Sequence, residues 1–112
     1  MEFRKIADDY SVAPQLTAAD IPAVAAAGFK SVICNRPDAE HPGEASAHEV
    51  EAAAEKAGLA FRYIPVVSGQ ITPQDVADQA AALADLPRPV LAYCRTGGRC
   101  TNLYGLVQQH RR

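Results

Sequence analysis

The sequence predicts an α/β fold, a three-layer sandwich with a mostly parallel central sheet. Three features favour this class. Short apolar runs typical of buried strands alternate with segments of helical periodicity, the helical segments end at glycine or proline, and polar loops follow the strands. The 112 residues are expected to form one domain, and 48% of them are hydrophobic. Because alanine supplies much of that fraction, we expect a modest core.

The first elements are a strand and a helix. Residues 1–9 form a polar lead-in, and residues 10–13 form a short strand that proline ends. A helix follows, because Thr17 and Asp20 resemble a capping box at its start. Gly28 then suits the positive φ that a helix end requires.

The middle of the chain continues the alternation. Residues 29–34 are predicted as a strand, residues 35–44 as a polar loop, residues 46–57 as a helix and residues 59–67 as a third strand. The helix is expected to bury one face, made of Ala47, Val50, Ala54 and Ala57.

Along the sequence, the fourth strand lies between the last two predicted helices. Thr72, Pro73 and Asp75 favour a helix start, through a cap, a fixed φ and a negative charge at the dipole. Residues 90–93 then form a buried strand. The final helix opens near Cys100 and is expected to turn one side inward, made of Leu103, Leu106 and Val107.

The stretch after the fourth strand carries the chemistry. Cys94 ends the strand and faces the start of the last helix, where unpaired N–H groups and the helix dipole lower the pKa of a thiol. Gly97 and Gly98 allow the loop N–H groups to form an anion-binding nest. Arg99 can clamp the anion with two hydrogen bonds. The other candidate contacts to a substrate are Arg95, Thr96, Cys100 and Thr101.

The loop from Cys94 to Arg99 resembles the catalytic loops of cysteine-dependent phosphatases and rhodaneses. The wider chain resembles the phosphatase-like domain of beta-lactamase hydrolase-like proteins (DUF442), through residues 11–16 (SVAPQL), 34–38 (CNRPD), 64–66 (IPV) and 94–103. The resemblance implies a fold like that of dual-specificity phosphatases. It also implies a further helical segment after residue 112, so this chain is either a short member or a truncated one.

The length of the loop leaves two chemistries open. Cysteine phosphatases place five residues between cysteine and arginine, whereas four separate Cys94 from Arg99. Four is the spacing usual in rhodanese-type sulfurtransferases. The candidates are therefore a phosphatase with a cysteinyl-phosphate intermediate, a sulfurtransferase with a persulfide on Cys94, and a non-catalytic anion-binding module. The partner is a small oxyanion or phosphorylated substrate, or a thiol or sulfur donor.

A phosphatase needs an acid for the leaving oxygen. Asp38 is the preferred candidate, because it follows a strand that ends at the same sheet edge as Cys94. Glu40 and His41 are weaker candidates, and Asp75 fits a helix start better. By resemblance, either Thr101 or Cys100 assists the thiol as a leaving group. Cys34 and Cys100 are also candidate resolving thiols for Cys94.

Composition excludes several other classes. The net charge of −2 without a basic block argues against nucleic-acid binding. No apolar run reaches the ~20 residues that a membrane helix needs. We expect no signal peptide, because residues 1–9 are polar and no apolar stretch follows them. Three cysteines without a paired spacing favour a reducing cytoplasm. We expect no metal and no cofactor, because no histidine has a cysteine partner at zinc spacing.

Overall fold

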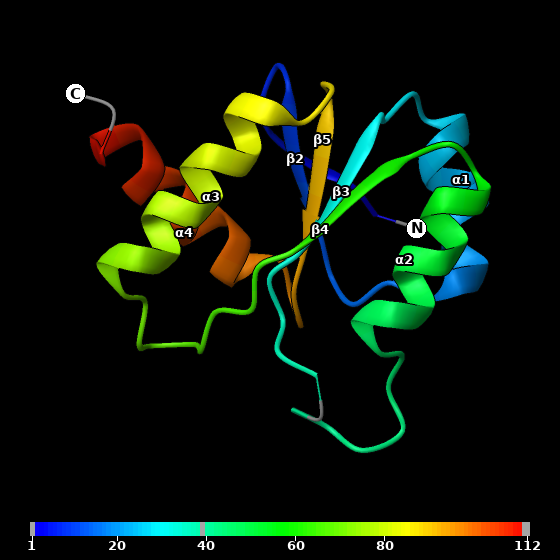
Figure 1. Cartoon of the computed structure of the whole chain (residues 1–112), viewed down its shortest axis with the longest axis horizontal. Coiled ribbons are helices and arrows are strands. Elements are labelled where there is room, and N and C mark those ends of the chain that lie inside the picture. Colours follow the sequence, from blue (N-terminus) through cyan, green and yellow to red (C-terminus); the bar gives the residue numbers. More distant parts are fainter. Residues whose placement is uncertain (1, 39, 111–112) are drawn as a thin grey trace.

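Five strands form one sheet in the order β1-β2-β5-β3-β4 (Figure 1). The structure is a computed structural model that describes residues 2–38 and 40–110. The strands are β1 (Arg4–Ala7), β2 (Tyr10–Ala13), β3 (Ser31–Cys34), β4 (Ala60–Tyr63) and β5 (Val90–Tyr93). The helices are η1 (Ala18–Asp20), α1 (Ile21–Ala26), α2 (Ala47–Lys56), α3 (Pro73–Asp85) and α4 (Gly98–His110).

The central strand β5 is paired on both sides with parallel strands. Val90 lies opposite Tyr10 of β2 and opposite Ser31 of β3, and β3 pairs in parallel with the edge strand β4. Only β1 is antiparallel among the strands of the described residues. Every residue of β2, β3 and β5 is buried, as expected for strands covered on both faces.

Helices cover both faces of the sheet, which confirms the three-layer α/β prediction. Figure 1 shows α3 and α4 on one side of the sheet and α1 and α2 on the other. On the first side, Leu103 and Val107 of α4 pack with Ile33 and Ala92 of the sheet. On the second, Val24 of α1 and Val50 of α2 pack with Val32 and Leu91. Fully burying one such side chain contributes about 1.5–3 kcal/mol.

The predicted helix starts are confirmed by their caps. The Asp75 carboxylate accepts from the Thr72 N–H at 2.9 Å, and the Thr72 hydroxyl accepts from the Asp75 N–H at 3.1 Å. Asp20 likewise accepts from the Thr17 N–H at 2.8 Å. Gly28 adopts a φ of 96°, which closes α1 as expected.

Three predictions about the elements were wrong. Residues 4–7 form the edge strand β1 instead of a polar lead-in, because an exposed edge strand lacks the apolar pattern of a buried one. The strand predicted over residues 59–67 is shorter, since Pro65 has no N–H to continue the ladder. Ala57 and Leu106 were expected to face inward, and both are exposed.

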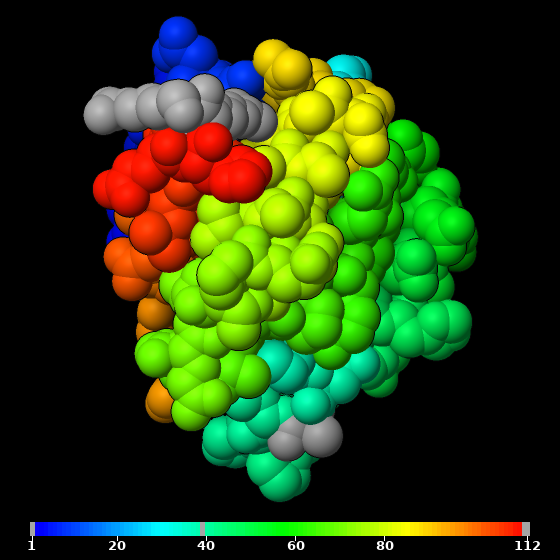
Figure 2. Space-filling model, turned by 60° about the vertical axis from the view of Figure 1, so that its left-hand side comes forward, coloured from blue at the N-terminus to red at the C-terminus, as the bar shows by residue number. Residues whose placement is uncertain are grey.

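The loops that follow the parallel strands meet at one end of the sheet, as predicted. The backbone beyond β4 stays beside the end of β3, because the Ile64 N–H donates to the Cys34 carbonyl and the Val66 N–H donates to the Asn35 carbonyl. Figure 2 shows residues 35–38 and 40–44 next to the segment that leads into α3. Among the described residues, no helix is both long enough and apolar enough to cross a bilayer.

Candidate active site

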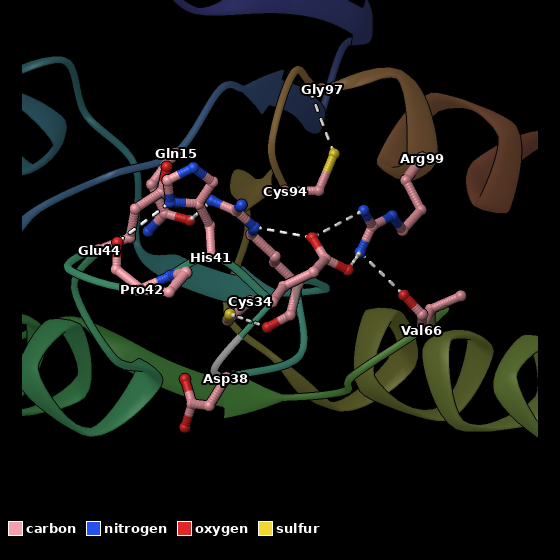
Figure 3. Close-up of polar contacts among 12 residues, drawn as sticks. Gln15, Cys34, Asp38, His41, Pro42, Glu44, Val66, Cys94, Gly97 and Arg99 are labelled. Atoms are coloured by element: carbon pink, nitrogen blue, oxygen red, sulfur yellow. Dashed lines mark hydrogen bonds and ion pairs between the residues drawn. The ribbon is translucent and has the colours of Figure 1, made fainter. Parts of the chain in front are cut away.

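Cys94 lies directly after β5, at the floor of the loop that leads into α4. It is 1% exposed, and the Gly97 N–H donates to its sulfur at 3.1 Å. Gly97 has a φ of 92°, in the region that favours glycine, and this turn aims its N–H back at the sulfur. The loop therefore holds the sulfur between β5 and the first turn of α4 (Figure 3).

The environment of Cys94 favours the thiolate. A hydrogen bond from the Cys100 thiol, with backbone N–H groups of Cys100, Thr96 and Gly97, outweighs burial and lowers the pKa of Cys94 to about 5. Burial raises the pKa of Cys100 well above the ordinary thiol range, and the neighbouring Cys94 raises it further. At neutral pH, these shifts favour the thiolate of Cys94 and the neutral thiol of Cys100.

The positions of Thr101 and Cys100 separate two roles that the sequence leaves open. The Thr101 hydroxyl donates to the Gly97 carbonyl at 2.9 Å and so stabilises the loop. The Thr96 hydroxyl accepts from the Gly98 N–H at 3.2 Å, again within the loop. Of Thr101 and Cys100, Cys100 is the one whose side chain lowers the pKa of Cys94.

Hydrogen bonds fix the Arg99 side chain and leave one edge of its guanidinium without a partner among the described residues. Its side chain is 7% exposed. Nη1 donates to the Val66 carbonyl at 2.9 Å and to Glu40 at 3.1 Å, and Nη2 donates to the other oxygen of Glu40 at 3.1 Å. The buried Nε has no hydrogen-bond partner among the described residues.

The free edge of Arg99 suits an oxyanion. A guanidinium carries five N–H groups, and three of them are occupied by Glu40 and Val66. The remaining two, on Nε and Nη2, point in parallel along one edge, and this spacing matches two oxygens of an anion. Figure 3 shows Cys94 and Val66 on opposite sides of the Arg99 guanidinium.

Glu40 joins Arg99 to a second buried arginine. Its Oε1 accepts from Nε of Arg36 at 2.8 Å, and the Arg36 side chain is 5% exposed. Gln15 accepts from Nη1 of Arg36 at 3.0 Å, and Glu44 forms an ion pair with the same nitrogen. Burial acts to raise the pKa of Glu40, but hydrogen bonds and charge from Arg99 and Arg36 outweigh it and lower the pKa.

Above Cys94 the surface is hollowed into a pocket of about 360 Å³. A volume in this range accommodates a small ligand. The pocket is lined by Arg36, Glu40, His41, Ser68, Cys94, Arg95, Thr96 and Arg99. It therefore combines residues from the loops after β3, β4 and β5, and arginine predominates among its charged residues.

Asp38 lies apart from this pocket. Its carboxylate accepts from the Ala47 N–H at 2.8 Å, at the start of α2, and Figure 3 shows it directed away from Cys94. A carboxylate in that place stabilises the helix terminus. The position of Asp38 thus gives no support to the general-acid role expected from the sequence.

Cys34 also points elsewhere. Its thiol donates to the Arg36 carbonyl at 3.3 Å, and it packs in the core on the α1–α2 side of the sheet. Cys94 and Cys100 belong to the core on the α3–α4 side. Of the two candidate resolving thiols, Cys100 is the one that the structure brings to Cys94.

No role for Arg36 or Ser68 was predicted from the sequence, and Glu40 was predicted only as a weaker candidate for the general acid. Their signal was positional only: each follows a strand at the carboxyl edge of the sheet, where ligands of parallel α/β proteins bind. Such a position does not show whether a side chain turns toward the loop of Cys94. Among the described residues, no group of three or more His, Cys, Asp or Glu side chains is arranged to hold a metal.

Comparison with known proteins identifies the family of the chain. Residues 2–110 match the family model of the beta-lactamase hydrolase-like protein, phosphatase-like domain. A beta-lactamase hydrolase-like protein of Agrobacterium fabrum is 37% identical over 106 residues, which are 95% of this chain and 25% of the relative. The chain thus spans about a quarter of that relative's length.

Solved structures show the same fold. A crystal structure described as that of a candidate phosphatase from Neisseria meningitidis has a TM-score of 0.89 and 37% identity, covering 96% of this chain and 77% of that one. The core catalytic domain of the PP-IP phosphatase SIW14 from S. cerevisiae has a TM-score of 0.73 and 15% identity, covering 96% and 64%. The latter likeness shows the fold alone. The chain therefore belongs to the phosphatase-like domain family of beta-lactamase hydrolase-like proteins.

Proposed function

We propose that this domain is a cysteine-dependent phosphatase that hydrolyses small phosphomonoesters through a cysteinyl-phosphate on Cys94. One observation carries the proposal. Cys94, whose lowered pKa favours the thiolate, and Arg99, whose Nε has no partner among the described residues, line the same pocket next to the N-terminus of α4. A nucleophile beside donors for developing negative charge is the arrangement that phosphoryl transfer requires.

The first chemical step follows from these positions. The Cys94 thiolate attacks phosphorus, forming an S–P bond while the P–O bond to the leaving group breaks. The equatorial oxygens receive hydrogen bonds from loop N–H groups and from Nε and Nη2 of Arg99. In the second step water attacks phosphorus, the S–P bond breaks, and Cys94 leaves as the thiolate that its hydrogen bond from Cys100 stabilises.

A paired assay on wild type and Cys94→Ser tests the proposal. One arm follows phosphate release from an aryl phosphate, and the other follows thiocyanate formation from thiosulfate and cyanide. We expect phosphate release in wild type that the variant loses. Phosphate release that persists in Cys94→Ser would contradict the proposed nucleophile.

Sulfur transfer is the second candidate, favoured by two observations. Four residues separate Cys94 from Arg99, and the carboxylate in the pocket, Glu40, is held ionised by two arginines. Transfer of sulfur to a thiol leaves no alkoxide to protonate. Thiocyanate formation with an adduct of about 32 Da on Cys94, the mass of one sulfur atom, would identify this activity. If neither phosphate nor thiocyanate is formed, the non-catalytic anion-binding module is favoured.

A further inference from the structure

We propose that His41 is the general acid of the phosphatase reaction, donating the proton on Nε2 to the leaving oxygen. This inference rests on the proposed function, and it assigns the general acid, for which no other residue has been identified among those that line the described pocket. A poor leaving group departs as an alkoxide unless an acid protonates it as the P–O bond breaks. The acid must therefore reach the pocket that holds Cys94.

The acidic side chains near the pocket are unsuited to this role. Both oxygens of Glu40 accept hydrogen bonds from guanidinium groups, so the carboxylate carries no proton to give. Asp38 lies outside the pocket and accepts from the start of α2. Asp75 accepts from the Thr72 N–H at the start of α3. Among the described lining residues, His41 is the side chain whose type normally titrates near neutrality.

The contacts of His41 leave one ring nitrogen for the substrate. Its Nδ1 lies 3.0 Å from the Pro42 carbonyl, which can accept only if Nδ1 carries a proton. Nε2 is then the nitrogen that gains or loses the second proton. His41 is exposed and lines the pocket on the wall formed by the loop after β3.

Charges of both signs surround the ring. His41 lines two adjoining pockets. The charged residues of its own loop in these pockets are Arg36, Asp38, Glu40 and Glu44. From the loop after β5, they are Cys94, Arg95 and Arg99.

The proton balance closes over the two steps. In the first, Nε2–H of protonated His41 passes its proton to the leaving oxygen, which keeps the electron pair of the broken P–O bond. Neutral His41 then accepts a proton from the water that attacks the cysteinyl-phosphate. Phosphate departs, Cys94 returns to the thiolate, and His41 regains its charge.

A series of leaving groups tests the role. Wild type, His41→Asn and the matched control His48→Asn, an exposed histidine on α2, are assayed with 2,4-dinitrophenyl phosphate and with phenyl phosphate across pH 5 to 8. General-acid catalysis contributes about 10²–10⁴-fold and matters least when the leaving group is already a weak base. We expect His41→Asn to lose at least about 100-fold in kcat/KM, which reports the steps up to departure of the leaving group, on phenyl phosphate and less than about 5-fold in kcat/KM on the dinitrophenyl ester.

The remaining outcomes decide against the inference in distinguishable ways. Equal losses in kcat/KM on both esters would make His41 a structural residue. An unchanged kcat/KM on phenyl phosphate would show that His41 is not the general acid. If Asp38→Asn lowers kcat/KM on phenyl phosphate but not on the dinitrophenyl ester, then Asp38 is the general acid. If wild type releases no Cys94-dependent phosphate even from the dinitrophenyl ester, then the proposed function itself fails.

Discussion

Among single residues, the thiol of Cys100 has the largest influence on the chemistry of Cys94. Cys100 is fully buried in the first turn of α4, and its hydrogen bond is the main cause of the lowered pKa of Cys94. A neutral thiol and a hydroxyl can both donate to a thiolate, whereas a methyl group cannot. The identity of this one side chain should therefore set the pH range in which Cys94 is reactive.

Replacement of Cys100 should shift the alkylation profile of Cys94. In wild type, the rate of alkylation by iodoacetamide should rise with pH through a midpoint near 5, where the thiolate forms. Cys100→Ala should move the midpoint up by about one pH unit or more, since a hydrogen bond to a charged group is worth about 1.5–3 kcal/mol. The alkylation midpoint of Cys94 should be lower in Cys100→Ser than in Cys100→Ala, because a hydroxyl can still donate to the thiolate. Coincident midpoints in the three proteins, measured in a Cys34→Ala background, would contradict this.

Glu40 affects the site through Arg99. Its carboxylate occupies the Nη1–Nη2 edge of the guanidinium and leaves the Nε–Nη2 edge for the anion. It also ties Arg99 to Arg36, whose side chain is buried among Gln15 and Glu44. Glu40 is thus expected to position Arg99 and not to compete with the substrate for it.

Removal of the Glu40 charge should weaken anion binding. In Glu40→Gln, one amide oxygen replaces two carboxylate oxygens, so Arg99 loses part of its support. We expect the inhibition constant of inorganic phosphate to rise about 10-fold, on the scale of a charge-assisted hydrogen bond. Glu55→Gln, an exposed change on α2, serves as the control. Tighter phosphate binding by Glu40→Gln would show instead that the carboxylate competes for Arg99.

At the scale of elements, the loop between β5 and α4 depends on one unusual backbone conformation. Gly97 has a positive φ, and a Cβ built there would lie 3.4 Å from side-chain atoms of Arg4 and Val12. Gly98 has no such φ, and its added Cβ would meet the Thr96 hydroxyl at 3.3 Å. The two neighbouring glycines therefore form a matched pair for substitution.

Alanine at position 97 should cost more than alanine at position 98. Gly97→Ala forces an L-residue into the left-handed region, which costs about 1–2 kcal/mol, and it shifts the N–H that donates to Cys94. We expect a lower free energy of unfolding and a higher alkylation midpoint for Cys94. Gly98→Ala should change both quantities less, because alanine favours the first turn of α4. Equal effects, measured by urea unfolding and alkylation, would exclude a special role for the Gly97 backbone.

The sequence predicted elements well where a local signal exists. Thr72 and Asp75 marked the start of α3 because a reciprocal cap is encoded within four residues. β1 carried no such signal, since its strand character comes from pairing with β2 and not from burial. That Cys94 and Arg99 lie in one pocket could be predicted from their short spacing in the chain. The bridge from Arg99 to Glu40 could not, because it joins residues 59 positions apart.

Across the whole molecule, a buried amide pair links the site to α3. Asn35, directly after β3, donates to Gln79 at 2.9 Å and to the Ile64 carbonyl at 3.0 Å, and Gln79 donates back to Asn35 at 3.2 Å. Both side chains are fully buried. The pair thus fastens α3 to the edge of the sheet from which Arg36 and Glu40 extend.

Loss of this pair should destabilise the fold. Gln79→Leu leaves the Asn35 side chain without one acceptor and one donor, and an unsatisfied buried polar group costs about 1–3 kcal/mol. Gln74→Leu, an exposed change on the same helix, should stay within about 0.5 kcal/mol of wild type. Urea unfolding measures both free energies. A similar stability for the two variants would mean that the pair contributes little.

The most direct test of the account is a search for the covalent intermediate on Cys94. Wild type and Cys94→Ser are mixed with 2,4-dinitrophenyl phosphate, quenched in acid within milliseconds and digested for mass spectrometry. The account predicts an adduct of roughly 80 Da, one phosphoryl group, on the Cys94 peptide of wild type and none in the variant. Release of phosphate by wild type with Cys94 unmodified at every quench time, and at a rate that Cys94→Ser matches, would contradict the central claim.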